Sequence, residues 1–508
     1  MRVARRARRP GSPAAAVLAT LLLLAGACER GLDEPLEPIV LRALPLDVEA
    51  PPARPPQRPW NLVLISLDTL RADHLGAYGY ARATSPRIDA LAREGVLFEQ
   101  AYSTAPKTAP AHMSLMTGLY PPAHGVRNFE GRIDVSLGAD VPTLAEILRV
   151  AGYRTAATTS GGNVHRDLGF GRGFQVYEHL PGEAEPVFDR ALAHLERLAA
   201  AGPEAPPFLL FVHTFQLHDP YVPPPETRAL FVDPDYRGKI VSDRDALTRL
   251  AGEEWHQRNA MFWAGVDPED PADLQHLKDL YDACLRAADN QVGRLLDALD
   301  RLALREDTLL VLLSDHGEEF HDHGGFGHDT LYDELLRVPL VMRLPPEADP
   351  PPEGARVEPV VRLVDVLPTI LELLGLPSLE HAQGRSLLPL LRGAEERERA
   401  AYAYHVEVDA SALRAQDWKL VSTPEARVVF DLSRDAAERR GRSADGTVVG
   451  DDLARALGSF TSWSDRIRQL APPGKPVALD PETRRSLEAL GYLRPEGAPK
   501  RGAPAGVE

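Results

Sequence analysis

Cysteine is almost absent from this chain of 508 residues, which has only Cys28 and Cys284. If Cys28 is processed as described below, an internal disulfide is excluded, because a bridge needs two thiols. Cys284 falls on a helical pattern with Leu277 and Leu280, which predicts a small core residue. Long apolar runs are also lacking. No stretch is long and apolar enough to span a bilayer, and the one at the N-terminus is too short.

Positive charge is in short supply as well, since 57 Lys and Arg stand against 74 Asp and Glu, giving a net charge of −17. This balance argues against a nucleic-acid partner, which would need a basic face. It does not exclude an anionic ester substrate, because a bound metal ion can supply the missing charge. The composition, 44% hydrophobic and 26% charged, is that of a globular protein. The length permits several domains, or one large α/β domain with an appendage. The sequence leaves protein partners unknown.

The first 28 residues have the pattern of a targeting segment. Arg2, Arg5 and further arginines precede a short apolar stretch over residues 14–27, which is typical of a signal peptide. The stretch ends in Leu24-Ala25-Gly26-Ala27-Cys28, which resembles a bacterial lipoprotein signal, although Ala25 stands where Leu is usual. We expect lipidation of Cys28 and an anchor to a bacterial membrane in the cell envelope, facing the periplasm or the exterior. Plain secretion is the alternative. Residues 29–59 are rich in proline and would form an extended tether.

Buried strands alternate with helices over residues 60–393, which predicts an α/β catalytic domain with a doubly wound, mostly parallel sheet. The expected strands cover residues 61–67, 154–160, 208–212, 308–314 and 338–343, and the expected helices 85–96, 187–199 and 274–299. After Gly393 the pattern changes. Short strands at 401–408, 418–421 and 427–432 predict a small antiparallel sheet within a subdomain over residues 394–494. Residues 434–451 are expected to form a surface loop, and residues 495–508 a disordered tail.

Polar side chains follow three of the predicted buried strands. Asp68 ends the first, the pair His218-Asp219 follows another, and Asp315-His316 ends a third. Open α/β sheets bind their ligands at the carboxyl ends of the strands. Carboxylates together with imidazole favour one divalent ion such as Zn or Mn, with Ca or Mg also open. A turn-capping role for Asp68 is the structural alternative.

The stretch from Ala105 to Gly118 places a hydroxyl, Thr108, where a helix is expected to begin. Thr is a good N-cap, and Pro110 follows where backbone N–H groups have no intrahelical partner. The start of a helix also favours an anion. Thr108 could therefore be a nucleophile against a charged ester, with His112 one turn on and Lys107 beside it. The alternative is a capped helix without chemistry.

The motifs resemble those of the sulfatase family, within the alkaline phosphatase superfamily. The matching pieces are Leu67-Asp68-Thr69 with the strand before it, Met116-Thr117-Gly118, Ser314-Asp315-His316-Gly317, Arg337-Val338-Pro339-Leu340, Val364-Asp365-Val366 and Phe430-Asp431-Leu432. The resemblance implies a large α/β domain carrying a small C-terminal antiparallel sheet. It also implies metal ligation by Asp68, Asp315 and His316.

The chain departs from the family at the nucleophile. The family motif is Cys (or Ser)-x-Pro-Ser-Arg, whose first residue is oxidised to formylglycine, whereas this chain has Thr108-Ala109-Pro110-Ala111-His112. Oxidation of Thr would give a ketone instead of the aldehyde. Together with Thr69 and His316, this set looks more like the single-metal site of Thr-dependent phosphoryl transferases of the superfamily, with Thr108 as a further metal ligand.

The resemblance then implies roles for the other polar residues. His218 and His328, the latter where many sulfatases carry Lys, would hold substrate oxygens or protonate the leaving alcohol. His112 replaces the Arg of the motif as a further catalytic candidate, and Lys107 and His213 are candidates for substrate binding. For His213 a hydrogen-bonded core histidine is the alternative, and for Lys107 an exposed side chain. His321 and His323 are expected in a solvated loop, and His74 and His124 in structural turns.

Three functions remain open from the sequence. The first is a metal-dependent hydrolase or transferase of phosphate or phosphonate esters with Thr108 as nucleophile. The second is a sulfatase that works without formylglycine. The third is a surface-anchored binding protein that has lost its chemistry, against which the complete set of Asp68, Thr108, Asp315 and His316 argues.

Overall fold

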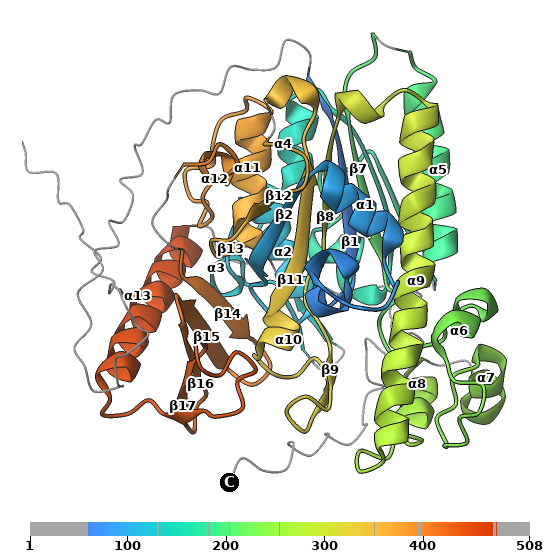
Figure 1. Cartoon of the computed structure of the whole chain (residues 1–508). Helices are drawn as coiled ribbons and strands as arrows, with labels where there is room; N and C mark the ends of the chain where they lie inside the picture. The colour runs from blue at the N-terminus through green and yellow to red at the C-terminus, as the bar shows by residue number, and fades with distance from the viewer. Residues whose placement is uncertain are drawn as a thin grey trace, which may run out of the picture.

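The computed structural model describes residues 59–474, apart from 130–131, 181–182, 203, 253–254, 350, 395–398 and 471–473. The expected signal segment, nearly all of the tether and the tail from residue 495 lie outside the described residues. The described chain forms a large α/β layer structure with a smaller antiparallel sheet at one end (Figure 1). Among these residues, no helix combines the length and apolar character needed to cross a membrane.

A sheet of nine strands forms the centre of the molecule, in the order β12-β2-β11-β8-β1-β7-β5-β6, with β13 also paired to β2. The strands are β1 (Asn61–Leu67), β2 (Val96–Tyr102), β5 (Arg154–Ser160), β6 (Val176–Leu180), β7 (Phe208–Thr214), β8 (Thr308–Leu313), β11 (Arg337–Arg343), β12 (Ala355–Val357) and β13 (Val361–Arg362). Only β11 runs antiparallel to its neighbours β2 and β8. The predicted doubly wound, mostly parallel sheet is confirmed.

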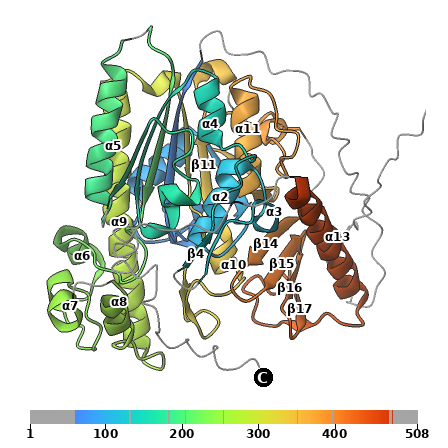
Figure 2. The same ribbon diagram turned by 180° about the vertical axis from the view of Figure 1, so that it is seen from behind.

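Both faces of the sheet are covered, because side chains alternate between two cores along each buried strand. In β1, Leu62 and Leu64 face one core, whereas Val63 and Ile65 face the other. The first core is closed by α2 (Thr108–Thr117), α4 (Leu144–Val150) and α11 (Val366–Leu373), and the second by α1 (Pro86–Glu94), α5 (Ala184–Ala199) and α9 (Pro271–Arg301). Figure 1 shows α1 in front of the sheet, and Figure 2 shows α2 and α4 on the opposite face.

The helix expected over residues 85–96 ends two residues early, because Gly95 breaks it and Val96 already begins β2. The sequence analysis missed β2 because no polar turn separates it from the helix. It also missed a helical insertion between β7 and α9, formed by α6 (Pro225–Phe231), α7 (Arg244–Ala251) and α8 (Trp255–Trp263). This insertion lies beside the start of α9 (Figure 1).

The C-terminal sheet is antiparallel throughout, as predicted, and consists of β14 (Ala401–His405), β15 (Ala410–Ala415), β16 (Trp418–Ser422), β17 (Arg427–Asp431) and β18 (Arg442–Ser443). The expected surface loop over residues 434–451 is wrong in its last part, where α13 (Val448–Leu470) begins. Val449, Leu453 and Ala456 follow helical spacing and pack on the sheet, so their burial drives the helix. Smaller elements are α3 (Pro121–His124), α10 (Asp333–Leu336), α12 (Leu388–Leu391) and the short hairpins of β3 (Arg127–Phe129) with β4 (Arg132–Val135) and β9 (Glu319–Phe320) with β10 (Phe326–Gly327).

A buried ion-pair network joins the two sheets. Lys419 of β16 is fully buried, and its Nζ lies 2.7 Å from Asp333 Oδ1 at the start of α10 and 2.7 Å from Glu438 Oε1. The other oxygen of Asp333 accepts a hydrogen bond of 2.7 Å from Tyr102 Oη at the end of β2.

We expect Lys419→Ala to lower the free energy of unfolding by roughly 3–5 kcal/mol, because it leaves buried carboxylates without their cation. Denaturant unfolding measures this loss. The control is Arg434→Ala, whose exposed side chain pairs with Asp431 at 3.8 Å and should contribute about 1 kcal/mol or less. A Lys419→Ala protein as stable as the control would show that the network does not hold the sheets together.

Candidate metal and nucleophile site

Asp68 follows the last residue of β1 in the middle of the sheet, between β7 and β8. Its backbone N–H donates to Thr214 O at 3.0 Å, which continues the ladder to β7. Its Oδ2 accepts from His213 Nε2 at 3.2 Å, while no hydrogen-bond donor among the described residues reaches its Oδ1. Asp68 is therefore a fully buried carboxylate with one oxygen left without a hydrogen bond.

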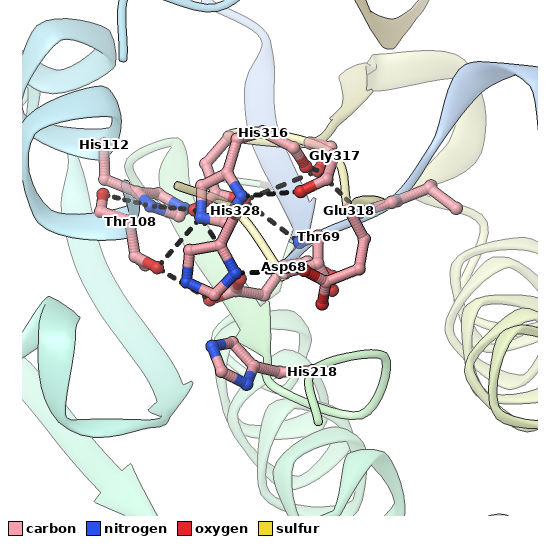
Figure 3. Close-up of polar contacts among 12 residues, drawn as sticks. Asp68, Thr69, Thr108, His112, His218, His316, Gly317, Glu318 and His328 are labelled. Carbon is pink, nitrogen blue, oxygen red and sulfur yellow. Dashed lines mark hydrogen bonds and ion pairs between the residues drawn. The ribbon is translucent and has the colours of Figure 1, made fainter. Parts of the chain in front are cut away.

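Asp315 and His316 come from the end of β8, next to β1. Ser314 ties the two strand ends together, because its hydroxyl donates to Leu67 O at 2.8 Å. His316 Nδ1 donates to Gly317 O at 2.9 Å, so Nε2 is the nitrogen with a lone pair to offer. His316 Nε2 lies 3.4 Å from Asp315 Oδ2 and 3.8 Å from Asp68 Oδ1 (Figure 3).

These three side chains fit a divalent ion. Asp68, Asp315 and His316 offer ligand atoms that all lie within 4.8 Å of one another, and all three residues are buried. Asp68 Oδ1 and Asp315 Oδ2 are buried without a hydrogen-bond donor, a costly arrangement that a cation would relieve. Two carboxylates and one imidazole suit Zn or Mn better than Ca, which prefers oxygen alone.

Thr108 reaches this cluster from α2. Contrary to the prediction, it does not cap the helix. Lys107 occupies the N-cap position, without a side-chain capping bond, and Thr108 is the first residue of α2. The Thr108 hydroxyl donates to Asp68 Oδ2 at 3.4 Å and lies 3.2 Å from His316 Nε2 (Figure 3). The capping prediction is wrong because the hydroxyl turns away from the helix backbone toward a carboxylate and an imidazole.

His112 holds the start of α2 against the sheet. Its Nδ1 donates to Thr108 O at 3.0 Å and lies 3.4 Å from Asp315 Oδ2, and its Nε2 lies 2.8 Å from Ser66 Oγ in β1. Burial opposes a charge on this ring, but the Asp315 carboxylate raises the pKa of His112. The structure thus places His112 behind Thr108, fully enclosed, where it fixes the position of the hydroxyl.

His213 lies within β7, because that strand extends two residues beyond its predicted end. The ring is fully buried, its Nε2 donates to Asp68 Oδ2 at 3.2 Å, and burial lowers the pKa of the imidazole. The structure therefore places His213 against a ligand carboxylate. This arrangement fits the alternative interpretation from the sequence, in which His213 is a hydrogen-bonded core histidine.

His218 approaches the cluster from the loop after β7 (Figure 3). Its Nδ1 donates to the Asp219 main-chain oxygen at 3.1 Å and lies 2.6 Å from Asp219 Oδ1, and its ring stacks on Phe215 at 3.9 Å between centroids. Burial disfavours a charged ring, yet the Asp219 carboxylate outweighs it and raises the pKa of His218 to about 9. His218 is accordingly a cation at neutral pH.

His328 lies between His218 and His316, with ring centroids 4.9 Å from His218 and 4.7 Å from His316. Its Nδ1 lies 3.1 Å from Glu318 Oε1. Burial, followed by the positive charge of Lys107, holds the pKa of His328 well below its usual range. Sequence reasoning did not single out Glu318, whose pKa is raised well above its usual range by burial and by Asp219. The sequence signal that could have identified Glu318 is its position two residues after His316.

Lys107 lies mostly buried at the rim beside Thr108, so the exposed alternative is wrong. Its ammonium pairs with Asp329 and lies 3.7 Å from Glu407 Oε2 in the turn after β14. His321 and His323 lie in the loop after β9, as expected, but they are half-buried there and not fully solvated. His323 stacks on Tyr332 at 3.6 Å, and its Nε2 lies 3.2 Å from Glu334 Oε2, while His321 stacks on Phe326 at 5.1 Å.

His74 and His124 have structural contacts, as expected. His74 Nδ1 lies 2.7 Å from Asp282 Oδ1 on α9. His124 Nδ1 accepts from the Val126 backbone at 3.0 Å, and burial lowers the pKa of this histidine to about 3.

A mostly parallel sheet with buried carboxylates, imidazoles and a hydroxyl at the carboxyl end of its central strands defines an ester-cleaving hydrolase of the alkaline phosphatase type. The family model described as Sulfatase matches residues 60–376, and the chain belongs to the sulfatase family. A second model, described as N-sulphoglucosamine sulphohydrolase, C-terminal, matches residues 321–448.

Known relatives and structures agree with this assignment. Steryl-sulfatase of Mus musculus is 30% identical over 454 residues, which cover 71% of this chain and 69% of the relative. The structure of BT4656 with its substrate D-glucosamine-2-N,6-O-disulfate has a TM-score of 0.65 at 20% identity, covering 82% of this chain and 99% of that one. Phosphonate monoester hydrolase of Agrobacterium radiobacter has a TM-score of 0.61 at 22% identity, and the match covers 84% of this chain and 100% of that one. At these identities the structural likenesses show the fold alone.

We expect Asp68→Asn, Asp315→Asn and His316→Ala each to lose bound metal, because each removes one of few ligands. Elemental analysis of protein purified with added Zn or Mn, together with calorimetric titration, measures the loss. The control is Asp289→Asn, another buried carboxylate, which accepts from the backbone of Arg87 and Ile88. Stoichiometric metal in all three ligand variants would refute the site.

Proposed function

We propose that this member of the sulfatase family is a metal-dependent hydrolase or transferase of phosphate or phosphonate esters with Thr108 as its nucleophile. The observation that carries the proposal is the position of the Thr108 hydroxyl, 3.4 Å from Asp68 Oδ2 and 3.2 Å from His316 Nε2. A hydroxyl in this position is surrounded by the groups that could activate it. The same buried set counts against an inactive binding protein, which would have no need to retain it.

The choice of phosphorus over sulfur rests on the identity of residue 108. The resemblance implies that sulfatases use an aldehyde hydrate made from Cys or Ser, and Thr cannot supply that aldehyde. A plain hydroxyl nucleophile is the form that the Thr-dependent phosphoryl transferases of the superfamily use. The fold itself does not decide, because a protein with a disulfated sugar substrate and a phosphonate monoester hydrolase share it with this chain.

The first step would be in-line attack of Thr108 Oγ on phosphorus. An Oγ–P bond forms, the P–O bond to the leaving alcohol breaks, and the hydroxyl proton passes toward Asp68 Oδ2, its acceptor at 3.4 Å. A divalent ion held by Asp68, Asp315 and His316, with Thr108 as a further ligand, supplies Lewis acidity that favours the ionised hydroxyl and offsets charge on the substrate oxygens. The backbone N–H groups at the start of α2 would donate to the same oxygens.

The leaving alcohol takes its proton from His218, the residue suited to this step because Asp219 keeps the imidazole charged at neutral pH. His328 and Lys107 would hold the remaining substrate oxygens from the rim. Water, or an acceptor alcohol, then attacks the phosphorus of the Thr108 ester while neutral His218 takes up the proton of the attacking hydroxyl. As the Oγ–P bond breaks, the proton held by Asp68 Oδ2 returns to Thr108 Oγ, so this second step restores Thr108, the Asp68 carboxylate and the charged His218.

A second candidate is hydrolysis of sulfate esters without formylglycine. It is favoured by the family model and by the 30% identity to a steryl-sulfatase. The two candidates use the same residues and differ in the atom attacked.

We expect Thr108→Ala to lower kcat/KM by at least about 10³-fold and to weaken metal binding while the fold remains, because the nucleophile is removed. Thr108→Ser should keep part of the activity, since the hydroxyl stays. The matched control is Thr117→Ala on the same helix, whose hydroxyl donates to Met113 O at 2.7 Å and should be dispensable for turnover. Wild-type turnover by Thr108→Ala would end the nucleophile assignment.

The same enzymes are assayed with p-nitrophenyl phosphate, a phosphate diester, a phenylphosphonate monoester and p-nitrophenyl sulfate. The proposal requires a higher kcat/KM for at least one phosphorus ester than for the sulfate. The opposite order, with loss of sulfate cleavage in Thr108→Ala, would establish the second candidate instead.

We also propose that the protein is anchored in the cell envelope through lipidated Cys28, a site outside the described residues. The support is the basic segment, the apolar stretch and the terminal Cys of the sequence. We expect wild-type protein expressed in bacteria to fractionate with membranes and to incorporate a radiolabelled fatty acid, and Cys28→Ser to do neither. Equal membrane association and labelling of the two proteins would refute the lipoprotein interpretation.

A further inference from the structure

The helical insertion reaches the catalytic cluster through one carboxylate, that of Asp219. Asp219 Oδ2 accepts from Trp263 Nε1 at 2.5 Å and from Asn259 Nδ2 at 3.1 Å, both of which lie on α8. Its other oxygen, Oδ1, lies 2.6 Å from His218 Nδ1. Asp219 and Asn259 are buried, and Trp263 is partly buried against the core of that face.

This arrangement fixes the carboxylate in two ways. Two donors on one oxygen prevent the group from rotating, so Oδ1 stays directed at the imidazole. Because the carboxylate is out of contact with water, its field on His218 is weakly screened. Trp263 is in turn held by ring contacts, 5.2 Å from Phe262 and 5.1 Å from Phe326 between centroids.

We propose that Asn259 and Trp263 of α8 are positioning residues that act on His218 through Asp219. The inference rests on the proposed function in one respect, namely that His218 gives the proton to the leaving alcohol. It adds an assignment for the insertion over residues 225–263, which otherwise has no part in the chemistry. The insertion would thus set the acidity of the residue that protonates the product.

Other titratable groups also face the His218–Asp219 pair and must stay constant in a test. Asp68 faces it from the end of β1, Glu318 from the segment after β8, His328 from the following loop, and Tyr221 from the chain after Asp219. Asn259 and Trp263 carry no charge, so their replacement removes hydrogen bonds to Asp219 without changing the charge around it. The sign of the effect follows directly. A carboxylate that turns away stabilises the imidazolium less, and the pKa of His218 falls from about 9.

The test uses Trp263→Phe, which keeps an aromatic ring and removes the N–H, and Asn259→Ala, which removes the other donor. The matched control is Met261→Leu, a volume-conserving change on the same helix that leaves both donors in place. Thermal unfolding selects the variants that remain folded. The His218 signal is followed in metal-loaded enzyme by ¹H–¹⁵N correlation NMR against pH, and is assigned by its loss in His218→Gln. The pH profile of kcat/KM is measured on the same proteins.

We expect the pKa of His218 to fall by about one unit in Trp263→Phe and in Asn259→Ala, and to stay unchanged in Met261→Leu. Since the charged ring is the acid, activity is present below that pKa and is lost as pH rises through it. The alkaline limb of kcat/KM should therefore move to lower pH by the same amount. An unchanged or raised pKa of His218 in both variants would overturn the inference. A lower pKa with an unmoved alkaline limb would support the positioning by α8 and refute instead the role of His218 as the acid.

Discussion

Two carboxylates, Asp68 and Asp315, are buried side by side at the carboxyl end of β1 and β8, and the charge of this pair governs the rest of the site. Like charges in a medium of low dielectric repel strongly, so the pair persists only with positive partners around it. His112, whose pKa is raised by Asp315, supplies part of this charge, and His213 donates a hydrogen bond to Asp68. One oxygen of each carboxylate still lacks a hydrogen-bond donor. A divalent cation would complete the balance, and this need makes the cluster a candidate metal site.

The position of Thr108, the proposed nucleophile, depends on the same carboxylates, because both Thr108 and His112 contact them at the start of α2. His112 bridges from Thr108 O to Ser66 in β1 and to Asp315, so the first turn of the helix is held by the strand ends themselves. The capping bond that Thr would normally make is given up, and the hydroxyl faces Asp68 and His316 instead. The lost cap would have contributed about 1 kcal/mol. The packing of α2 in the first core supplies far more than that.

The sequence was sufficient for the parts of the site that follow from strand periodicity. Asp68 and Asp315-His316 end continuous apolar runs, and the carboxyl ends of neighbouring parallel strands meet at one edge, so their convergence could be predicted. The capping role of Thr108 could not be judged, since it depended on partners 40 and 208 residues away. The hydrogen bond from Trp263 to Asp219 could not be predicted either, because the two residues lie far apart in the sequence. The helix α13 was missed because its apolar stripe is narrow and its other face is charged.

Two histidines of the rim show how position, and not residue type, assigns chemistry here. The rings of His218 and His328 lie 4.9 Å apart, yet their pKa values shift in opposite directions. His218 has the Asp219 carboxylate against it, whereas His328 contacts Glu318, whose own pKa is raised by burial, and the positive charges of Lys107 and of other imidazoles oppose a charge on its ring. Two histidines whose pKa values are shifted in opposite directions can have different roles in an ester-cleaving site. One can give a proton, and the other can bind the substrate in its neutral form. The sequence predicts both near Thr108, the proposed nucleophile, but only the side chains packed around each ring show which of them is suited to act as the proposed acid.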